Sequence, residues 1–68
     1  MKFKLNNKPE EIEGKVKITV NELLELKKFS WKLMVVKING EVIKKDDFAK
    51  AEIHDGDNVS VMLLMAGG

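Results

Sequence analysis

One segment of the chain has the pattern of an amphipathic helix, whereas the rest has the pattern of strands and turns. Thr19 and Glu22 have the spacing of a capping box, in which each side chain accepts a hydrogen bond from the backbone N–H of the other residue. Apolar residues follow at spacings that place them on one helix face: Val20, Leu23, Leu24 and Leu26. The pattern predicts a helix from Val20 to about Phe29. A single helix can cover only one face of a small sheet.

The segment before this helix has the pattern of a β-hairpin. Phe3 and Leu5 alternate with polar residues, as in a half-buried strand. Residues 6–9, Asn-Asn-Lys-Pro, are typical of a turn. A second strand is indicated over residues 12–18, with an interruption at Gly14. The two strands are expected to pair as an N-terminal hairpin.

The segment after the helix contains three further strand patterns. Leu33–Ile38 is mostly apolar and β-branched. Asn39-Gly40 then predicts a two-residue hairpin, because both central positions of a type I′ turn need positive φ. Glu41–Ile43 is the return strand, a short helical turn is expected near Phe48, and Val59–Met65 is the last strand. The order β-β-α-β-β-β predicts an α+β domain in which one main helix packs on a small mixed sheet.

A chain of 68 residues forms one domain with a small core. The residues expected in this core lie on the helix stripe and at the inward positions of the strands: Leu5, Val20, Leu23, Leu24, Val36, Ile38, Val59 and Val61.

Composition excludes several classes of function. The net charge is +1 and all twelve basic residues are Lys, so there is no electrostatic case for nucleic-acid binding. The absence of Cys excludes a disulfide scaffold, a thiolate metal site and a cysteine nucleophile. No apolar run approaches the roughly 20 residues of a membrane span, and no signal peptide is recognisable. A cytoplasmic protein with no membrane partner is expected.

Few side chains are candidates for chemistry. His54 is the single histidine and, without Cys, makes a poor metal site. Residues 55–57, Asp-Gly-Asp, lack the spacing of a calcium loop and are explained by turn chemistry, with Asp accepting backbone N–H bonds. Trp31 follows the helix, where it would either anchor a partner or cover the open end of the core. The sequence therefore predicts neither a catalytic residue nor a metal site.

The final strand predicts a surface for a partner. Alternation places Val59, Val61 and Leu63 on one face and Ser60, Met62 and Leu64 on the other. If the helix covers the first face, Met62 and Leu64 form an exposed apolar patch beside Met65. The alternative is a strand that loops bury on both sides.

The chain ends in Ala66-Gly67-Gly68. Two residues without Cβ can adopt almost any backbone conformation and can enter a narrow channel. We therefore expect a domain over residues 1–65 and a flexible tail over residues 66–68, in which the carboxylate of Gly68 is the working group.

Four blocks of the sequence together resemble the ThiS family of sulfur carrier proteins, which have the ubiquitin-like β-grasp fold. They are residues 19–24 (Thr-Val-Asn-Glu-Leu-Leu), residues 35–43 (Val-Val-Lys-Ile-Asn-Gly-Glu-Val-Ile), residues 55–59 (Asp-Gly-Asp-Asn-Val) and Gly67-Gly68. The chain departs from the family at Lys44-Lys45, where Arg is frequent. The resemblance implies that the first and last strands are parallel neighbours at the sheet centre.

The resemblance also implies a carrier that holds no permanent cofactor, rather than an enzyme. A ThiF-like adenylating enzyme would use ATP and Mg²⁺ to adenylate the carboxylate of Gly68. A cysteine desulfurase-type sulfur donor would convert the adenylate to a thiocarboxylate. A ThiG-like thiazole synthase would then take the sulfur for the thiazole ring of thiamine. In this reading Met62, Leu64 and Met65 contact the partners, and Ala66 and Gly67 carry the reactive end into their active sites.

Three alternatives use the same fold. The small subunit of molybdopterin synthase shares the fold and the tail, although such chains tend to be longer. A ubiquitin-like modifier would be joined through Gly68 to lysines of other proteins. A β-grasp binding module would use its surface without any chemistry at the tail.

Overall fold

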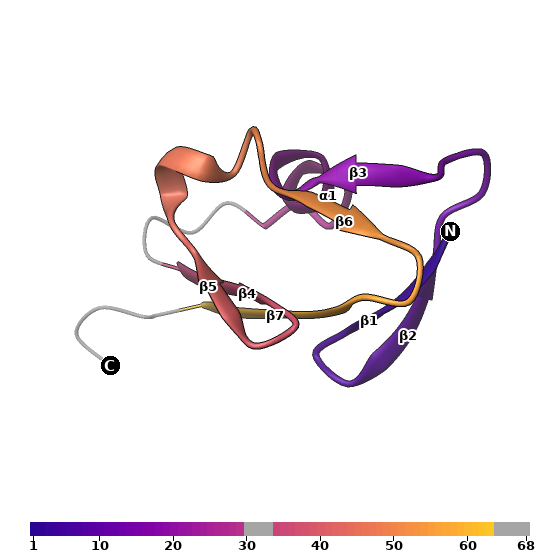
Figure 1. Ribbon diagram of the computed structural model, residues 1–68, viewed down its shortest axis with the longest axis horizontal. Helices are drawn as coiled ribbons and strands as arrows, with labels where there is room; N and C mark the ends of the chain where they lie inside the picture. Colours follow the sequence, from indigo (N-terminus) through magenta and orange to yellow (C-terminus); the bar gives the residue numbers. More distant parts are fainter. Residues whose placement is uncertain (30–33, 64–68) are drawn as a thin grey trace.

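The computed structural model describes residues 1–29 and 34–63, in which seven short strands, one α-helix and one 3-10 helix are present (Figure 1). Their bounds are β1 Lys2–Leu5, β2 Lys8–Glu11, β3 Lys17–Thr19, α1 Val20–Leu26, β4 Met34–Ile38, β5 Glu41–Ile43, η1 Lys45–Asp47, β6 Glu52–His54 and β7 Asn58–Leu63.

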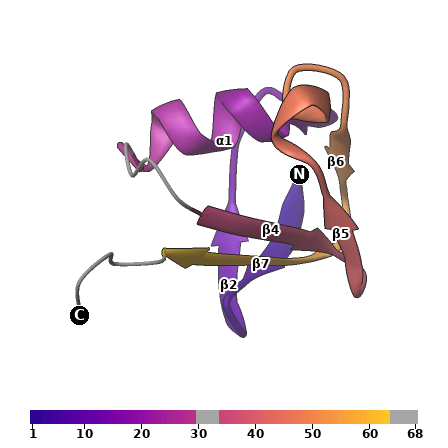
Figure 2. The same ribbon diagram turned by 90° about the vertical axis from the view of Figure 1, so that its left-hand side faces the viewer.

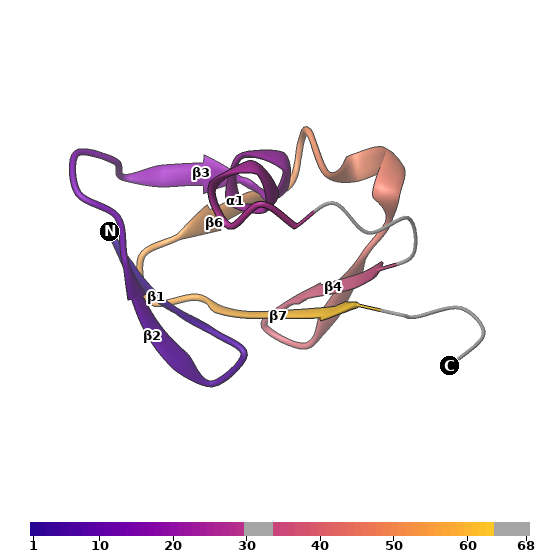
Figure 3. The same ribbon diagram turned by 180° about the vertical axis from the view of Figure 1, so that it is seen from behind.

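Five of the strands form the main sheet, in the order β2-β1-β7-β4-β5. β1 runs parallel to β7, with Lys4 opposite Asn58 and Leu5 opposite Val59, whereas the other neighbours are antiparallel. Figure 3 shows β4 and β7 side by side beneath α1. The first and last strands are therefore parallel neighbours in the sheet interior, which confirms the expected β-grasp topology.

The capping box at the start of α1 is confirmed. The backbone N–H of Glu22 donates to Thr19 Oγ1 over 3.1 Å, and the backbone N–H of Thr19 donates to Glu22 Oε1 over 3.0 Å. The second of these bonds stabilises the ionised carboxylate, so the pKa of Glu22 lies below its usual range, with Lys15 nearby adding to the effect.

The end of α1 differs from the prediction. The helix stops at Leu26 rather than near Phe29, because Lys28 adopts a left-handed conformation with φ of 58°. The backbone N–H groups of Lys28 and Phe29 then donate to Glu25 and Leu24 carbonyls, which is the Schellman pattern of a helix end. Leu26 also leaves the predicted apolar stripe, since its side chain is 57% exposed.

The predicted second strand over residues 12–18 is wrong. It is replaced by β2, which starts at Lys8 and pairs with β1, and by β3, which pairs with the unpredicted strand β6 in a separate two-stranded sheet. Gly14, with φ of 78°, lies in the turn between β2 and β3. Pro9 is accommodated because β2 is an edge strand of the main sheet.

The core lies between the main sheet and the layer of α1, β3 and β6. Every predicted core residue is buried except Ile38, which is partly buried and packs against the cluster. Four further residues complete it: Phe3, Ile18, Phe48 and Ile53.

We expect Leu23→Ala to lower the free energy of unfolding by about 2–5 kcal/mol, because Leu23 is fully buried and truncation leaves a cavity. Leu26→Ala is the matched control on the same helix, and its effect should stay within about 0.5 kcal/mol because the side chain is mostly exposed. Denaturant unfolding measures both. Equal losses for the two variants would contradict the assignment of the buried face.

Candidate functional site

The strand β7 shows the alternation that the sequence predicts. Val59 and Val61 are buried beneath the helix layer, whereas Ser60 is half-buried and Met62 is 57% exposed. Figure 2 shows α1 and η1 on the same side of the main sheet. The predicted exposure of Met62 is thus confirmed. Leu64, Met65, Ala66, Gly67 and Gly68, and also Trp31, lie outside the residues that the structure describes.

Met62 lies on the uncovered face of the sheet together with residues of β4 and β5. Strand register places Val35 opposite Met62, and it places Lys37 between Ser60 on β7 and Val42 on β5. The side chain of Val42 is 58% exposed, and that of Val35 is half-buried. We call Val35, Lys37, Val42 and Met62 the outer patch. It is a mostly apolar surface with a lysine among its residues.

Sequence reasoning found Met62 but missed the other members of the outer patch. The signal was present, because Val35 and Lys37 alternate with the inward-facing Val36 and Ile38. The two-residue turn at Asn39-Gly40 also determines the register between β4 and β5. What was missing was the order and register of the strands, which place the outward residues of β4 and β5 beside Met62 of β7.

The charge of Lys37 distinguishes the outer patch from a purely apolar surface. The lysine ion pairs found within residues 1–29 and 34–63 are Lys15–Glu22, Lys17–Glu52 and Lys27–Glu10. None of them includes Lys37. A partner that covers this patch must therefore accommodate the ammonium group as well as the apolar side chains.

The turn before β7 has the structural role that the sequence predicted. Asp57 accepts a hydrogen bond from the backbone N–H of His54 over 2.8 Å, and Asp55 accepts one from the backbone N–H of Lys2 over 2.7 Å. Gly56 has a φ of 87°. The carboxylates thus connect the turn to β1 and to β6. In the two described ranges of the chain, no group of three or more His, Cys, Asp or Glu residues could hold a metal ion.

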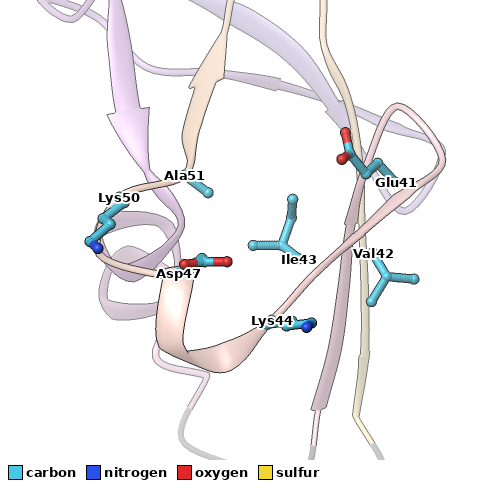
Figure 4. Close-up of a pocket in the computed structure, with 7 residues that line it drawn as sticks. All are labelled: Glu41, Val42, Ile43, Lys44, Asp47, Lys50 and Ala51. Carbon is cyan, nitrogen blue, oxygen red and sulfur yellow. The ribbon is translucent and has the colours of Figure 1, made fainter.

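An open pocket of about 450 Å³ lies beside the edge strand β5 (Figure 4). Its apolar residues are Val42, Ile43 and Ala51, and its charged residues are of both signs: Glu41, Lys44, Asp47 and Lys50. In the close-up, the side chains of Val42 and Ile43 point to opposite sides of β5. β4 separates this pocket from β7, and Val42 is the one residue of the outer patch that also lines it. No helix among the described residues is long and apolar enough to cross a membrane.

Comparisons with known proteins agree with this geometry. The model of the ThiS family matches residues 3–68. A crystal structure of the thiamine biosynthesis protein ThiS from Geobacter metallireducens is similar over the full length of both chains, with 33% identity and a TM-score of 0.88. An NMR structure of a thiamine biosynthesis protein from the same organism gives a TM-score of 0.82 at 33% identity, covering all of this chain and 88% of that one.

We expect Met62→Asp to leave the fold intact, because the side chain is mostly exposed on the outer patch. The change in unfolding free energy should be within about 0.5 kcal/mol. The adjacent substitution Val61→Asp places a carboxylate in the core and should cost about 4 kcal/mol or more. Thermal unfolding of the two variants measures the difference, and unfolding of the Met62 variant would place that residue in the core.

Proposed function

Because the chain belongs to the ThiS family, we propose that it is a sulfur carrier protein of thiamine biosynthesis whose sulfur is held at the C-terminal carboxylate of Gly68. The observation that carries this proposal is the match to the family model, which continues through the Gly-Gly end of the sequence. The similar solved structures, described as thiamine biosynthesis proteins, support the same pathway.

The chemistry explains why a carrier needs an activating partner. A carboxylate is negative and resonance-stabilised, so sulfur nucleophiles do not attack it readily. An oxygen of the Gly68 carboxylate would attack the α-phosphorus of ATP, and pyrophosphate would leave. The outer sulfur of a persulfide on a cysteine desulfurase-type donor would then attack the acyl carbon, and AMP would leave. A second thiol would reduce the resulting acyl disulfide, which releases the thiocarboxylate and leaves a disulfide between the two thiols. Splitting one difficult displacement into two easier ones lowers the barrier.

In this scheme the partners supply the catalytic groups. A ThiF-like enzyme would bind ATP and Mg²⁺, and a ThiG-like thiazole synthase would receive the sulfur. The carrier itself contributes placement, since it presents its reactive end at a limited distance from a recognised surface. Gly68 follows Met62 by six positions, so the carboxylate lies at most about 20 Å along the chain from the outer patch.

The outer patch is the surface that we propose for docking these partners. It is mostly apolar, it includes Met62 of the strand that leads toward Gly68, and it is on the face that α1 leaves uncovered. Lys37 adds a requirement for the partner, because burying an ammonium group without a counter-charge is strongly unfavourable. We infer that the partner surface is apolar and carries a carboxylate that meets Lys37.

Removal of Gly67 and Gly68 should abolish ATP–pyrophosphate exchange by the adenylating enzyme while leaving the melting temperature unchanged. The reason is that the truncation moves the terminal carboxylate back to Ala66, two residues closer to the domain and too short to reach the partner's active site, while it removes none of the core residues. Gly68→Ala should be milder, since it keeps the terminal carboxylate at position 68 and adds only a methyl group beside it. If the truncated chain still supports exchange, the carrier function is wrong.

Mass spectrometry of the chain from its native cell distinguishes the carrier from related functions. A sulfur carrier should show a mass gain that corresponds to one oxygen-to-sulfur exchange. Chains joined to other proteins through Gly68 would instead indicate a ubiquitin-like modifier, and the sulfur-carrier proposal would then be rejected.

Charge reversal at Lys37 tests the docking surface. We expect Lys37→Glu to weaken binding to the adenylating enzyme by about tenfold or more. The variant places a carboxylate opposite the partner carboxylate that we propose for Lys37, and the two like charges repel each other. Lys50→Glu is the control, since it makes the same charge change at a residue that follows η1 and is not a member of the outer patch. Isothermal titration calorimetry gives both dissociation constants. A comparable effect of the two variants would show that only the net charge of the carrier matters.

A further inference from the structure

The strand β7 extends beyond the point where β1 leaves the sheet. β1 ends at Leu5, which lies opposite Val59, and the chain then turns away at Asn6 and Asn7 with φ angles of 52° and 66°. β7 continues to Leu63. From Val61 onward, the side of β7 that faced β1 therefore has no residue of β1 opposite it.

The side chain of Asn6 takes the place of the missing strand. The backbone N–H of Asn6 still donates to the carbonyl of Val59 over 2.9 Å. Its amide group then binds both backbone groups of Val61: Oδ1 accepts from the N–H over 2.9 Å, and Nδ2 donates to the carbonyl over 3.2 Å. A side-chain amide has the same donor and acceptor as a peptide group, so it continues the ladder by one step.

We propose that Asn6 is a positioning residue that sets the direction in which β7 delivers the C-terminal carboxylate to the partner enzyme, an inference that rests on the proposed function. Val61 comes directly before Met62 of the outer patch and seven positions before Gly68. Beyond Val61, the strand pairing that the structure describes for β7 is with β4, through the pairs Met62–Val35 and Leu63–Met34. Without the amide of Asn6, β7 can bend about this one-sided pairing.

A small change of direction at Val61 matters because the reacting group lies several residues further on. The reaction requires the carboxylate to meet the α-phosphorus of ATP at bonding distance, and a misplacement of about 1 Å can cost on the order of a hundredfold in rate. Docking through the outer patch does not use the amide of Asn6. The loss of this amide should therefore lower kcat for adenylation and leave KM for the carrier nearly unchanged.

The chain provides a matched control at the other end of β7. Asn39 also lies in a two-residue turn with φ of 52°, and its Oδ1 accepts from the backbone N–H of Asn58 over 2.9 Å. Its own backbone N–H donates to the carbonyl of Asn58 over 2.7 Å. The Nδ2 of Asn39 donates to Asp57 Oδ1 over 3.1 Å rather than to a backbone carbonyl. Asn39 thus resembles Asn6 as a turn residue whose side chain holds the backbone of β7, but it does so at the end of β7 that is remote from Gly68.

The experiment compares Asn6→Gly with Asn39→Gly, since glycine accepts positive φ at both positions. ATP–pyrophosphate exchange by the adenylating enzyme is measured as a function of carrier concentration. We expect Asn6→Gly to lower kcat by about tenfold or more with KM within about twofold of the unsubstituted chain, and Asn39→Gly to leave both within about twofold. Amide hydrogen exchange should show faster exchange of the Val61 N–H in the first variant alone.

A second variant, Asn6→Asp, is tested in parallel because aspartate also tolerates the left-handed conformation. It retains an acceptor for the Val61 N–H but places a carboxylate oxygen against the Val61 carbonyl, so kcat should fall as in Asn6→Gly. The inference is overturned if kcat is retained in either folded Asn6 variant, if only KM changes, or if the Asn39 variant loses as much. If the unsubstituted chain supports no exchange, the proposed function itself fails, which is a separate result.

Discussion

The structure depends on the packing of one short helix against one face of the main sheet. Val20, Leu23 and Leu24 of α1 are buried, and the inward residues Val59 and Val61 of β7 belong to the same core cluster. A helix of this length cannot also cover the opposite face, so the alternate residues of β7 and β4 are left outside. The outer patch is thus a direct consequence of α1 covering only one face of the main sheet.

Local signals in the sequence predicted the elements that depend on nearby residues. The capping box identified the start of α1, and Asn39-Gly40 identified the β4–β5 hairpin. The end of α1 was missed because Lys28, rather than a glycine, takes the left-handed position. A lysine carries no sequence signal for that conformation, which is accompanied by the backbone hydrogen bonds of the helix end and by the packing of Phe29 against the core.

The second sheet could not be predicted, for a different reason. β3 and β6 are three residues each, and the apolar side chain of β6 is that of Ile53 alone. A pattern this short does not distinguish a strand from a loop. The pairing of Ile18 with Ile53 joins residues far apart in the sequence, and only the completed core makes it favourable. For the candidate site, Met62 was predicted from alternation, whereas Lys37 required the register of three strands.

In the proposed function, recognition by the partner and reaction at the carboxylate are separated along one strand. The inward residues of β7 stabilise the core, and its outward residue Met62 lies on the outer patch. The core of a 68-residue chain is small and leaves little room for an enclosed active site. A fold of this size can still present a reactive group at the end of its chain. The described pairing of β7 with β4 carries the rigidity of the sheet as far as Leu63. In the proposed function, the backbone pairing near Val61 is therefore where the described part of the domain can control the position of the C-terminal carboxylate.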